Sequence, residues 1–294
     1  MTQSSKLIAS VTLGLLLFSG CARRSSDQTN SLQIKGSDTM VNLGQAWAEE
    51  YMKQNPGTSI AVTGGGSGTG ITALVNSTCD IAEVSREMKE SEIELVASKG
   101  AAPKKIIVAL DGLAVVVSPA NKISEMTIDQ LADVFTGKIK NWKEVGGRDA
   151  KIVLLSREVN SGTHVYFKEH VLRHGKADGK EEFAAEALLL SSSQAIADEV
   201  AQNQDAIGYY GMGYITVKEK ALKVAKEKNS PAISPTMENV MSGAYPISRP
   251  LLMYTKGEAK GLAKTFIDYV LSPAGQQIVK KLDFVPVKSL EQSK

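Results

Sequence analysis

The chain has 294 residues, of which 43% are apolar and 22% charged, and its formal net charge at pH 7 is +2. This composition is typical of a globular protein with one large domain or two of ordinary size. The nearly balanced charge argues against a dedicated nucleic-acid-binding protein. It does not argue against a small-anion site, because one arginine and a few backbone N–H groups are enough to build one.

The first residues have the pattern of an export signal. Lys6 precedes an apolar run at residues 7–18, which is too short to span a bilayer comfortably and fits the apolar core of a signal peptide. Ser19-Gly20-Cys21 then resembles a bacterial lipobox, whose cysteine is lipidated after export. We therefore predict a signal peptide over 1–20, then a lipidated Cys21 with a flexible tether over 21–31. A plain secretory signal is the alternative.

The chain has one further cysteine, Cys79, so no disulfide framework is predicted. Cys79 leads into an apolar segment, which favours a buried thiol over a nucleophile. No later segment approaches 18 consecutive apolar residues, so we expect a folded body that does not span the membrane and lies outside the cytoplasm.

From residue 32 onward, short apolar runs alternate with amphipathic stretches, which is the pattern of an α/β protein. Strands are predicted at residues 32–35, 59–63, 81–84, 106–110, 113–118, 152–155, 206–210 and 251–254. Helices are predicted after most of them, with N-caps at Thr127 and Ser193, and Ser272-Pro273 divides the last two helices. Asp111-Gly112 is expected to end one strand and mark a first crossing between two lobes, with the return near residues 244–249.

Three loops share one pattern, in which small polar residues follow a strand and precede a helix. They are Ser37-Asp38-Thr39, Ser67-Gly68-Thr69 and Ser161-Gly162-Thr163. The first turn of a helix leaves N–H groups unpaired and carries partial positive charge, so it attracts anions, and hydroxyls can donate to the same ligand. Ser and Thr are also the usual helix caps, so any one loop is ambiguous. Two copies of Ser-Gly-Thr favour an anion site.

Two arginines lie close to these loops. Arg157 stands four residues before Ser161, where its guanidinium could hold two oxygens of a tetrahedral anion, or instead pair with Glu158 on the surface. Arg86 follows the third predicted strand, and an ion pair with Glu87 is its alternative role.

Catalysis and cofactor binding are not supported. The glycine loop at residues 64–70 fits neither the dinucleotide fingerprint nor the Walker A motif, and no nucleophile, base and orienting acid come together. His164, His170 and His174 are interpreted as hydrated surface residues, because Glu169 would point away from His170 on a helix. We therefore predict no catalytic residues, no metal and no cofactor.

With these motifs in view, the chain resembles the phosphate-binding lipoproteins of bacterial phosphate ABC transporters. The resemblance covers nearly the whole mature chain and rests on the order of residues 36–40, 65–70, 80–82, 85–86, 111–117, 157, 161–163 and 206–209. It implies an α/β, two-lobed periplasmic-binding-protein fold of type II, with a mixed sheet flanked by helices in each lobe and two hinge crossovers. The expected lobes are 32–110 plus 247–294, and 111–246.

The resemblance also implies the ligand and the residues that hold it. In the family, phosphate is held without water by hydroxyls, backbone N–H groups and one arginine from both lobes. The corresponding positions here are Thr39, Met40, Ser67, Arg157, Ser161, Gly162 and Thr163, to which we add Ser85 and Arg86. The expected partners are inorganic phosphate and the permease subunits of an inner-membrane ABC transporter, and the protein is expected to be a monomer.

One position departs from the family pattern. Well-known members have an aspartate after the third strand that accepts the proton of hydrogen phosphate and so excludes sulfate. Here that position is Ser85, which makes Asp38 and Glu83 the candidate proton acceptors. The alternatives are a receptor for sulfate, molybdate or tungstate, an extracytoplasmic phosphatase, and a surface protein that senses phosphate.

Overall fold

The computed structural model describes residues 30–176 and 178–287. The predicted signal peptide, Cys21 and nearly all of the predicted tether lie outside the described residues. Among the helices within these two ranges, none has both the length and the apolar character needed to cross a bilayer.

Nine strands of the described chain form one mixed sheet in the order β2-β1-β3-β11-β4-β8-β6-β7, with β9 beside β4. They are β1 (Ser31–Gly36), β2 (Ser59–Thr63), β3 (Ile81–Val84), β4 (Pro103–Val117), β6 (Val153–Arg157), β7 (Leu188–Leu190), β8 (Ala206–Gly211), β9 (Lys220–Ala221) and β11 (Ser248–Lys256). A separate parallel pair consists of β5 (Glu125–Thr127) and β10 (Lys223–Ala225).

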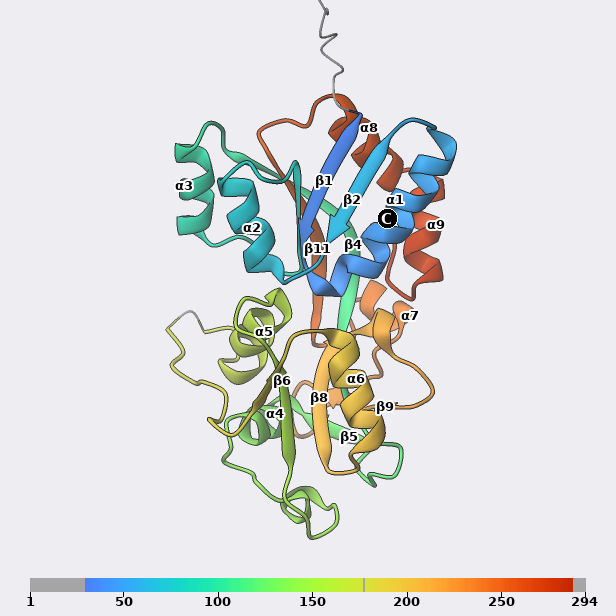
Figure 1. Cartoon of the computed structure of the whole chain (residues 1–294). Coiled ribbons are helices and arrows are strands. Elements are labelled where there is room, and N and C mark those ends of the chain that lie inside the picture. Colours follow the sequence, from blue (N-terminus) through green and yellow to red (C-terminus); the bar gives the residue numbers. More distant parts are fainter. Residues whose placement is uncertain (1–29, 177, 288–294) are drawn as a thin grey trace, which may run out of the picture.

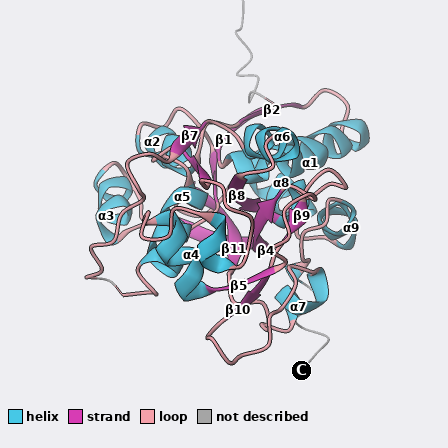
Figure 2. Ribbon diagram, turned by 90° about the horizontal axis from the view of Figure 1, so that it is seen from below, coloured by secondary structure: helices cyan, strands magenta, loops and turns pink. Residues whose placement is uncertain are grey.

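The helices form two groups, one above the other in Figure 1. The upper part holds α1 (Val41–Gln54), α2 (Ser67–Val75), α3 (Glu90–Ser98), α8 (Gly261–Val270) and α9 (Pro273–Lys281). The lower part holds α4 (Ile128–Phe135), α5 (Gly162–Phe167) and α6 (Ser193–Gln202), and the short α7 (Met237–Met241) lies beside the junction. Seen from below in Figure 2, the strands run through the middle, with α1, α8 and α9 to one side and α2, α3 and α4 to the other.

Strand β4 connects the two parts without interruption. Its first residues pair with β11 and its last five pair with β8, both antiparallel. The predicted strand end at Asp111-Gly112 is therefore wrong. Asp111 pairs in register with Arg249 of β11, which keeps the backbone extended. Gly112 allows the side chain of Val240 to pack closely against the strand, since a Cβ at this position would lie 2.7 Å from Cγ2 of Val240.

Most predicted element positions are confirmed, including the strands over 59–63 and 81–84. Thr127 caps α4 as expected, in a reciprocal capping box with Gln130 (2.9 and 3.1 Å). The predicted cap at Ser193 is wrong by one residue. The Ser192 hydroxyl accepts the cap hydrogen bond from the Ala195 N–H instead. The Ser193 hydroxyl donates to Asp38.

Each part has its own buried aromatic residues. In the upper part, Trp47 on α1 is fully buried and donates from Nε1 to the carbonyl of Gly275, which ties α1 to α9. In the lower part, Phe167 stacks on Tyr209 with ring centroids 3.9 Å apart. Cys79 is buried as predicted, and burial raises the pKa of its thiol to about 12.

Candidate functional site

The three small-polar loops meet where the upper and lower parts contact each other. The loop after β1 and the loop after β6 bring Thr39 and Thr163 together, with their hydroxyl oxygens 2.8 Å apart. Gly162 packs against the start of α2, and a Cβ at this glycine would lie only 2.3 Å from Oγ of Ser67 and 2.6 Å from Oγ of Ser85. Only glycine fits this close approach without displacing the hydroxyls.

Two of these hydroxyls come from the upper part and share one hydrogen-bond network. The backbone N–H of Ser85 donates to Oγ of Ser67 at 3.0 Å, and the two hydroxyl oxygens are 3.3 Å apart. Ser67, Ser85, Thr39 and Thr163 are all buried. On the opposite loop, the Ser161 hydroxyl caps α5 by accepting from the N–H of Thr163 at 3.2 Å. The site is therefore a buried cluster of hydroxyls contributed by both parts.

The guanidinium group in this cluster belongs to Arg249, which the sequence did not lead us to select. Its Nη2 lies 3.0 Å from Oγ1 of Thr163 and 3.4 Å from Oγ1 of Thr39, and its Nη1 donates to the carbonyl of Ser85 at 2.9 Å. Nε and Nη2 both donate to Oδ2 of Asp111, at 3.0 and 2.9 Å. Arg249 thus links hydroxyls of both parts to one buried carboxylate.

The Arg249–Asp111 pair is completely buried. Burial raises the pKa of the Asp111 carboxyl, and the charge of Arg249 opposes that rise. Asp111 also accepts a hydrogen bond from the backbone N–H of Met212 at 3.0 Å. The sequence does contain a signal for this pair: Asp111 interrupts the apolar run of β4, and Arg249 stands just before the apolar run of β11. Only the register of β4 with β11 places them opposite each other.

Arg157 is also buried, and its hydrogen bonds go to protein acceptors. Nη1 lies 2.9 Å from Oδ2 of Asp38 and donates to Oγ of Ser193 at the same distance, while Nη2 donates to the carbonyl of Ser191 at 2.8 Å. The N–H and hydroxyl of Ser193 donate to the same Oδ2. Burial lowers the pKa of the Arg157 guanidinium, and the Asp38 carboxylate counteracts this effect. Arg157 therefore fixes Asp38 between the two parts.

Two other selected residues have partners within the upper part. Arg86 makes a bidentate ion pair with Glu92, with both N···O distances 2.7 Å, rather than pairing with Glu87 as considered from the sequence. It also donates to the backbone carbonyl of Glu87. Met40 has a buried side chain, and its backbone N–H donates to the carbonyl of Ser37 at 3.1 Å.

Glu83, one of the two candidate proton acceptors, is buried on β3 and faces α1. Its carboxyl oxygens would lie 2.6 and 2.9 Å from a Cβ at Gly44, so the glycine makes room for the carboxyl group. Among the described residues, nothing hydrogen-bonds to its buried Oε1. Burial without a compensating cation raises the pKa of Glu83 to about 8.

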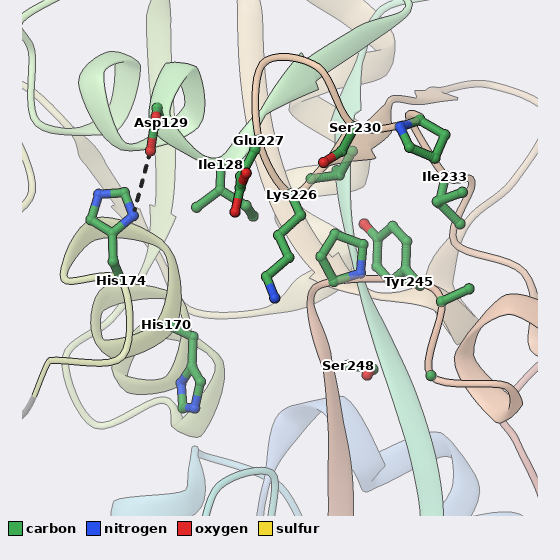
Figure 3. A pocket seen from close by; sticks show the side chains of 15 residues that line it. Ile128, Asp129, His170, His174, Lys226, Glu227, Ser230, Ile233, Tyr245 and Ser248 are labelled. Carbon is green, nitrogen blue, oxygen red and sulfur yellow. Dashed lines mark ion pairs between the residues drawn. The ribbon is translucent and has the colours of Figure 1, made fainter.

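Of the three histidines, His170 and His174 are exposed as predicted, whereas His164 is not. His164 is buried, with Nδ1 3.2 Å from Oγ of Ser156, and burial lowers its pKa to about 4, so its predicted surface position is wrong. His170 stacks on Tyr166, with ring centroids 3.8 Å apart. The ion pair of His174 with Asp129 (3.6 Å) is drawn in Figure 3.

His170 and His174 line a cavity of about 740 Å³ beside the segment that leads into β11. Across residues 30–176 and 178–287, no three His, Cys, Asp or Glu side chains are grouped so that they could hold a metal ion.

Comparison with known proteins shows which family the chain belongs to. A model of the PBP superfamily domain matches residues 23–274. The phosphate-binding protein PstS of Bacillus subtilis is 36% identical over 278 residues, covering 93% of this chain and 86% of the relative. PstS of Pseudomonas aeruginosa is 33% identical and covers 90% and 85%.

A solved structure of a substrate-binding protein with bound phosphate from Clostridium perfringens superposes with a TM-score of 0.79. It is 34% identical, and the match covers 87% of this chain and 99% of that one. An ABC-type phosphate transport receptor from Vibrio cholerae gives a TM-score of 0.70 at 30% identity, covering 86% and 99%. The chain is a member of the PBP superfamily, and within that superfamily it belongs to the family of PstS phosphate-binding proteins.

Proposed function

We propose that the protein is an extracytoplasmic receptor that captures inorganic phosphate and delivers it to an ABC transporter, and that it is not an enzyme. The observation that carries this proposal is the buried cluster of Thr39, Thr163, Ser67 and Ser85 hydroxyls beside Arg249. Hydroxyl groups and a guanidinium are the donors that a tetrahedral oxyanion requires. The relatives named for phosphate support the same ligand.

Phosphate would take its place between the two parts. Because the Thr39 and Thr163 hydroxyls are only 2.8 Å apart, the two loops have to separate before an oxyanion can enter. Arg249 and Asp111 formally neutralise each other, so the charge of the anion would be balanced by hydroxyl and N–H dipoles from the Ser161-Gly162-Thr163 loop and the start of α2. Arg157 would act mainly by positioning the Asp38 loop, and we leave Arg86 out of the proposed shell.

Asp38 is the better candidate for accepting the phosphate proton. The contacts of Arg157 and Ser193 all go to its Oδ2, which leaves Oδ1 for a further donor. Glu83 suits this role less well, since its carboxyl lies against Gly44 of α1, and burial raises its pKa to about 8, which favours the protonated form over the carboxylate.

We further propose the two-lobe division expected from the sequence, with lobes 32–110 plus 247–294 and 111–246. Two observations support it: β4 changes its partner from β11 to β8 just after residue 112, and residues 244–249 lead back into β11. Each proposed lobe then contains a mixed sheet covered by helices, which is the type II arrangement (Figure 1).

Titration calorimetry with purified protein tests the ligand. We expect exothermic, saturable binding of phosphate and much weaker binding of sulfate. Binding of sulfate, molybdate or tungstate without binding of phosphate would overturn the assignment. Steady release of phosphate from a model ester such as p-nitrophenyl phosphate would favour a phosphatase instead.

We also propose that Cys21 carries the lipid that keeps the receptor at the outer face of the cell membrane. The support is the apolar run followed by Ser19-Gly20-Cys21. Replacement of Cys21 by alanine is expected to move the protein from the membrane fraction to the soluble fraction of the cell envelope, because the anchor provides the membrane affinity. Immunoblots of the two fractions measure this, and an unchanged distribution would contradict lipidation.

A further inference from the structure

Asn160 makes contacts that the proposed phosphate shell does not use. It lies on the loop between β6 and α5, in the lower part of the molecule, and it touches the glycine loop between β2 and α2 in the upper part. Its side-chain amide donates to the carbonyl of Gly65 at 2.9 Å and lies 3.4 Å from Oγ1 of Thr69. Its own carbonyl accepts a hydrogen bond from the N–H of Gly68 at 2.9 Å. One residue therefore bonds to the opposite loop with both its side chain and its backbone.

Two glycines of the opposite loop allow this contact. A Cβ at Gly66 would lie 2.9 Å from the carbonyl oxygen of Asn160, and a Cβ at Gly68 would lie 3.2 Å from it. The first distance is too short for any Cβ, so a side chain at position 66 would displace the Asn160 backbone, whereas the second is tight enough that the Asn160 carbonyl would have to shift by a few tenths of an ångström. Gly66 also has a φ of +97°, which favours glycine for a second reason, whereas Gly68 is in the first turn of α2. At position 68, the close approach to Asn160 is the contact that a larger residue would disturb.

We infer that Asn160 fastens the two parts together and thereby sets how long phosphate is retained, an inference that rests on the proposed phosphate-binding function. Phosphate can leave only after the Thr39 and Thr163 loops separate, and the same movement breaks the Asn160 bonds. Asn160 is exposed at the rim, outside the buried hydroxyl cluster. It therefore acts as a positioning residue, and it should affect dissociation of phosphate more than association.

The test compares two variants with one matched control. Asn160→Ala removes the side-chain bonds and keeps the backbone bond to Gly68, while Gly68→Ala places a methyl group against the Asn160 carbonyl. Alanine also favours the helical backbone at position 68, so the second variant is expected to fold at least as well as wild type. Val159→Ala is the control, because Val159 is the preceding residue on the same loop and is 68% exposed.

Stopped-flow measurements of phosphate dissociation are expected to show about a fivefold faster rate in Asn160→Ala, the effect of losing one net hydrogen bond. Gly68→Ala should also release phosphate faster, with association rates close to wild type, and Val159→Ala should behave as wild type. Dissociation at the wild-type rate in both variants would overturn the inference.

A second readout does not require phosphate to bind. Amide hydrogen exchange in the segment 65–69 is expected to be faster in Asn160→Ala than in wild type, because the N–H of Gly68 loses protection when the loops separate more often. Equal exchange in the two proteins would overturn the role of Asn160. Absence of phosphate binding in wild type would instead count against the proposed function.

Discussion

Phosphate affinity is expected to fall roughly 10- to 100-fold when Arg249 is replaced by glutamine together with Asp111→Asn. The guanidinium is the only cation that contacts both the Thr39 and Thr163 hydroxyls among the described residues. A hydrogen bond to a charged group in a buried site contributes about 1.5–3 kcal/mol, which corresponds to this change in dissociation constant. Titration calorimetry of the double variant and wild type with phosphate measures the difference.

The double replacement separates binding from folding. Arg249→Gln alone would leave the Asp111 carboxylate buried without its cation, which is expected to destabilise the protein by about 3–5 kcal/mol. Replacing both partners removes the two buried charges together and leaves two neutral amides, of which asparagine matches aspartate in shape and glutamine is shorter than arginine. The matched control is Lys104→Gln with Glu258→Gln, an exposed pair at 2.8 Å whose removal should change neither stability nor affinity noticeably. Wild-type affinity in the Arg249 double variant would contradict the proposed site.

Replacing Glu83 by glutamine is expected to remove a large loss of stability that the wild-type protein undergoes as pH rises from about 4.5 to about 8. The folded-state pKa of Glu83 is raised to about 8 from an ordinary value of 4.5, so the folded protein holds a proton that the unfolded chain releases. The contribution of Glu83 to the free energy of unfolding therefore decreases as pH rises from about 4.5 to about 8 and stays constant above that. A shift of this size corresponds to a loss on the order of 3–5 kcal/mol.

Denaturant unfolding of both proteins at pH 5 and pH 9 measures this effect. All other titrating groups are common to the two chains, so the difference between their free energies of unfolding isolates Glu83. The variant should gain stability relative to wild type between pH 5 and pH 9, because a glutamine cannot ionise next to Gly44. Parallel pH profiles would show that Glu83 ionises freely in the folded protein.

Local sequence patterns predicted most of the elements and all three loops. Strands such as β2 and β3 could be located because apolar runs bounded by Gly, Pro and polar residues determine them locally. Thr39, Ser67 and Thr163 could be selected for a related reason, since each follows a strand and starts a helix. The two-lobe division was also predicted from the order of strands and helices, and the resemblance to a known family added the ligand.

The features that could not be predicted depend on contacts between residues far apart in the chain. The pairing of Arg249 with Asp111 could not be predicted, because the two residues are 138 positions apart and only the register of β4 with β11 places them opposite each other. Arg157 remains a predicted anion-site residue, and its contacts with Asp38 and Ser193 could not be predicted because these partners come from distant segments. His164 was predicted to be a surface residue because nothing in its local sequence indicates that Ser156 and the ring of Phe183 pack against it.

The uninterrupted run of β4 through both parts has a mechanical consequence. Two parts joined only by loops can swing freely, but here a 15-residue strand, hydrogen-bonded to β11 along much of its length, passes from one to the other. A movement that opens the two parts would therefore have to bend or twist this pair of strands, which a loop connection would not require. The register shift between Leu251 and Leu252, opposite residues 107–109 of β4, interrupts the regular hydrogen bonds of this pair of strands. We therefore expect the stiffness of one strand pair, as well as the ligand, to limit how far the two parts can separate.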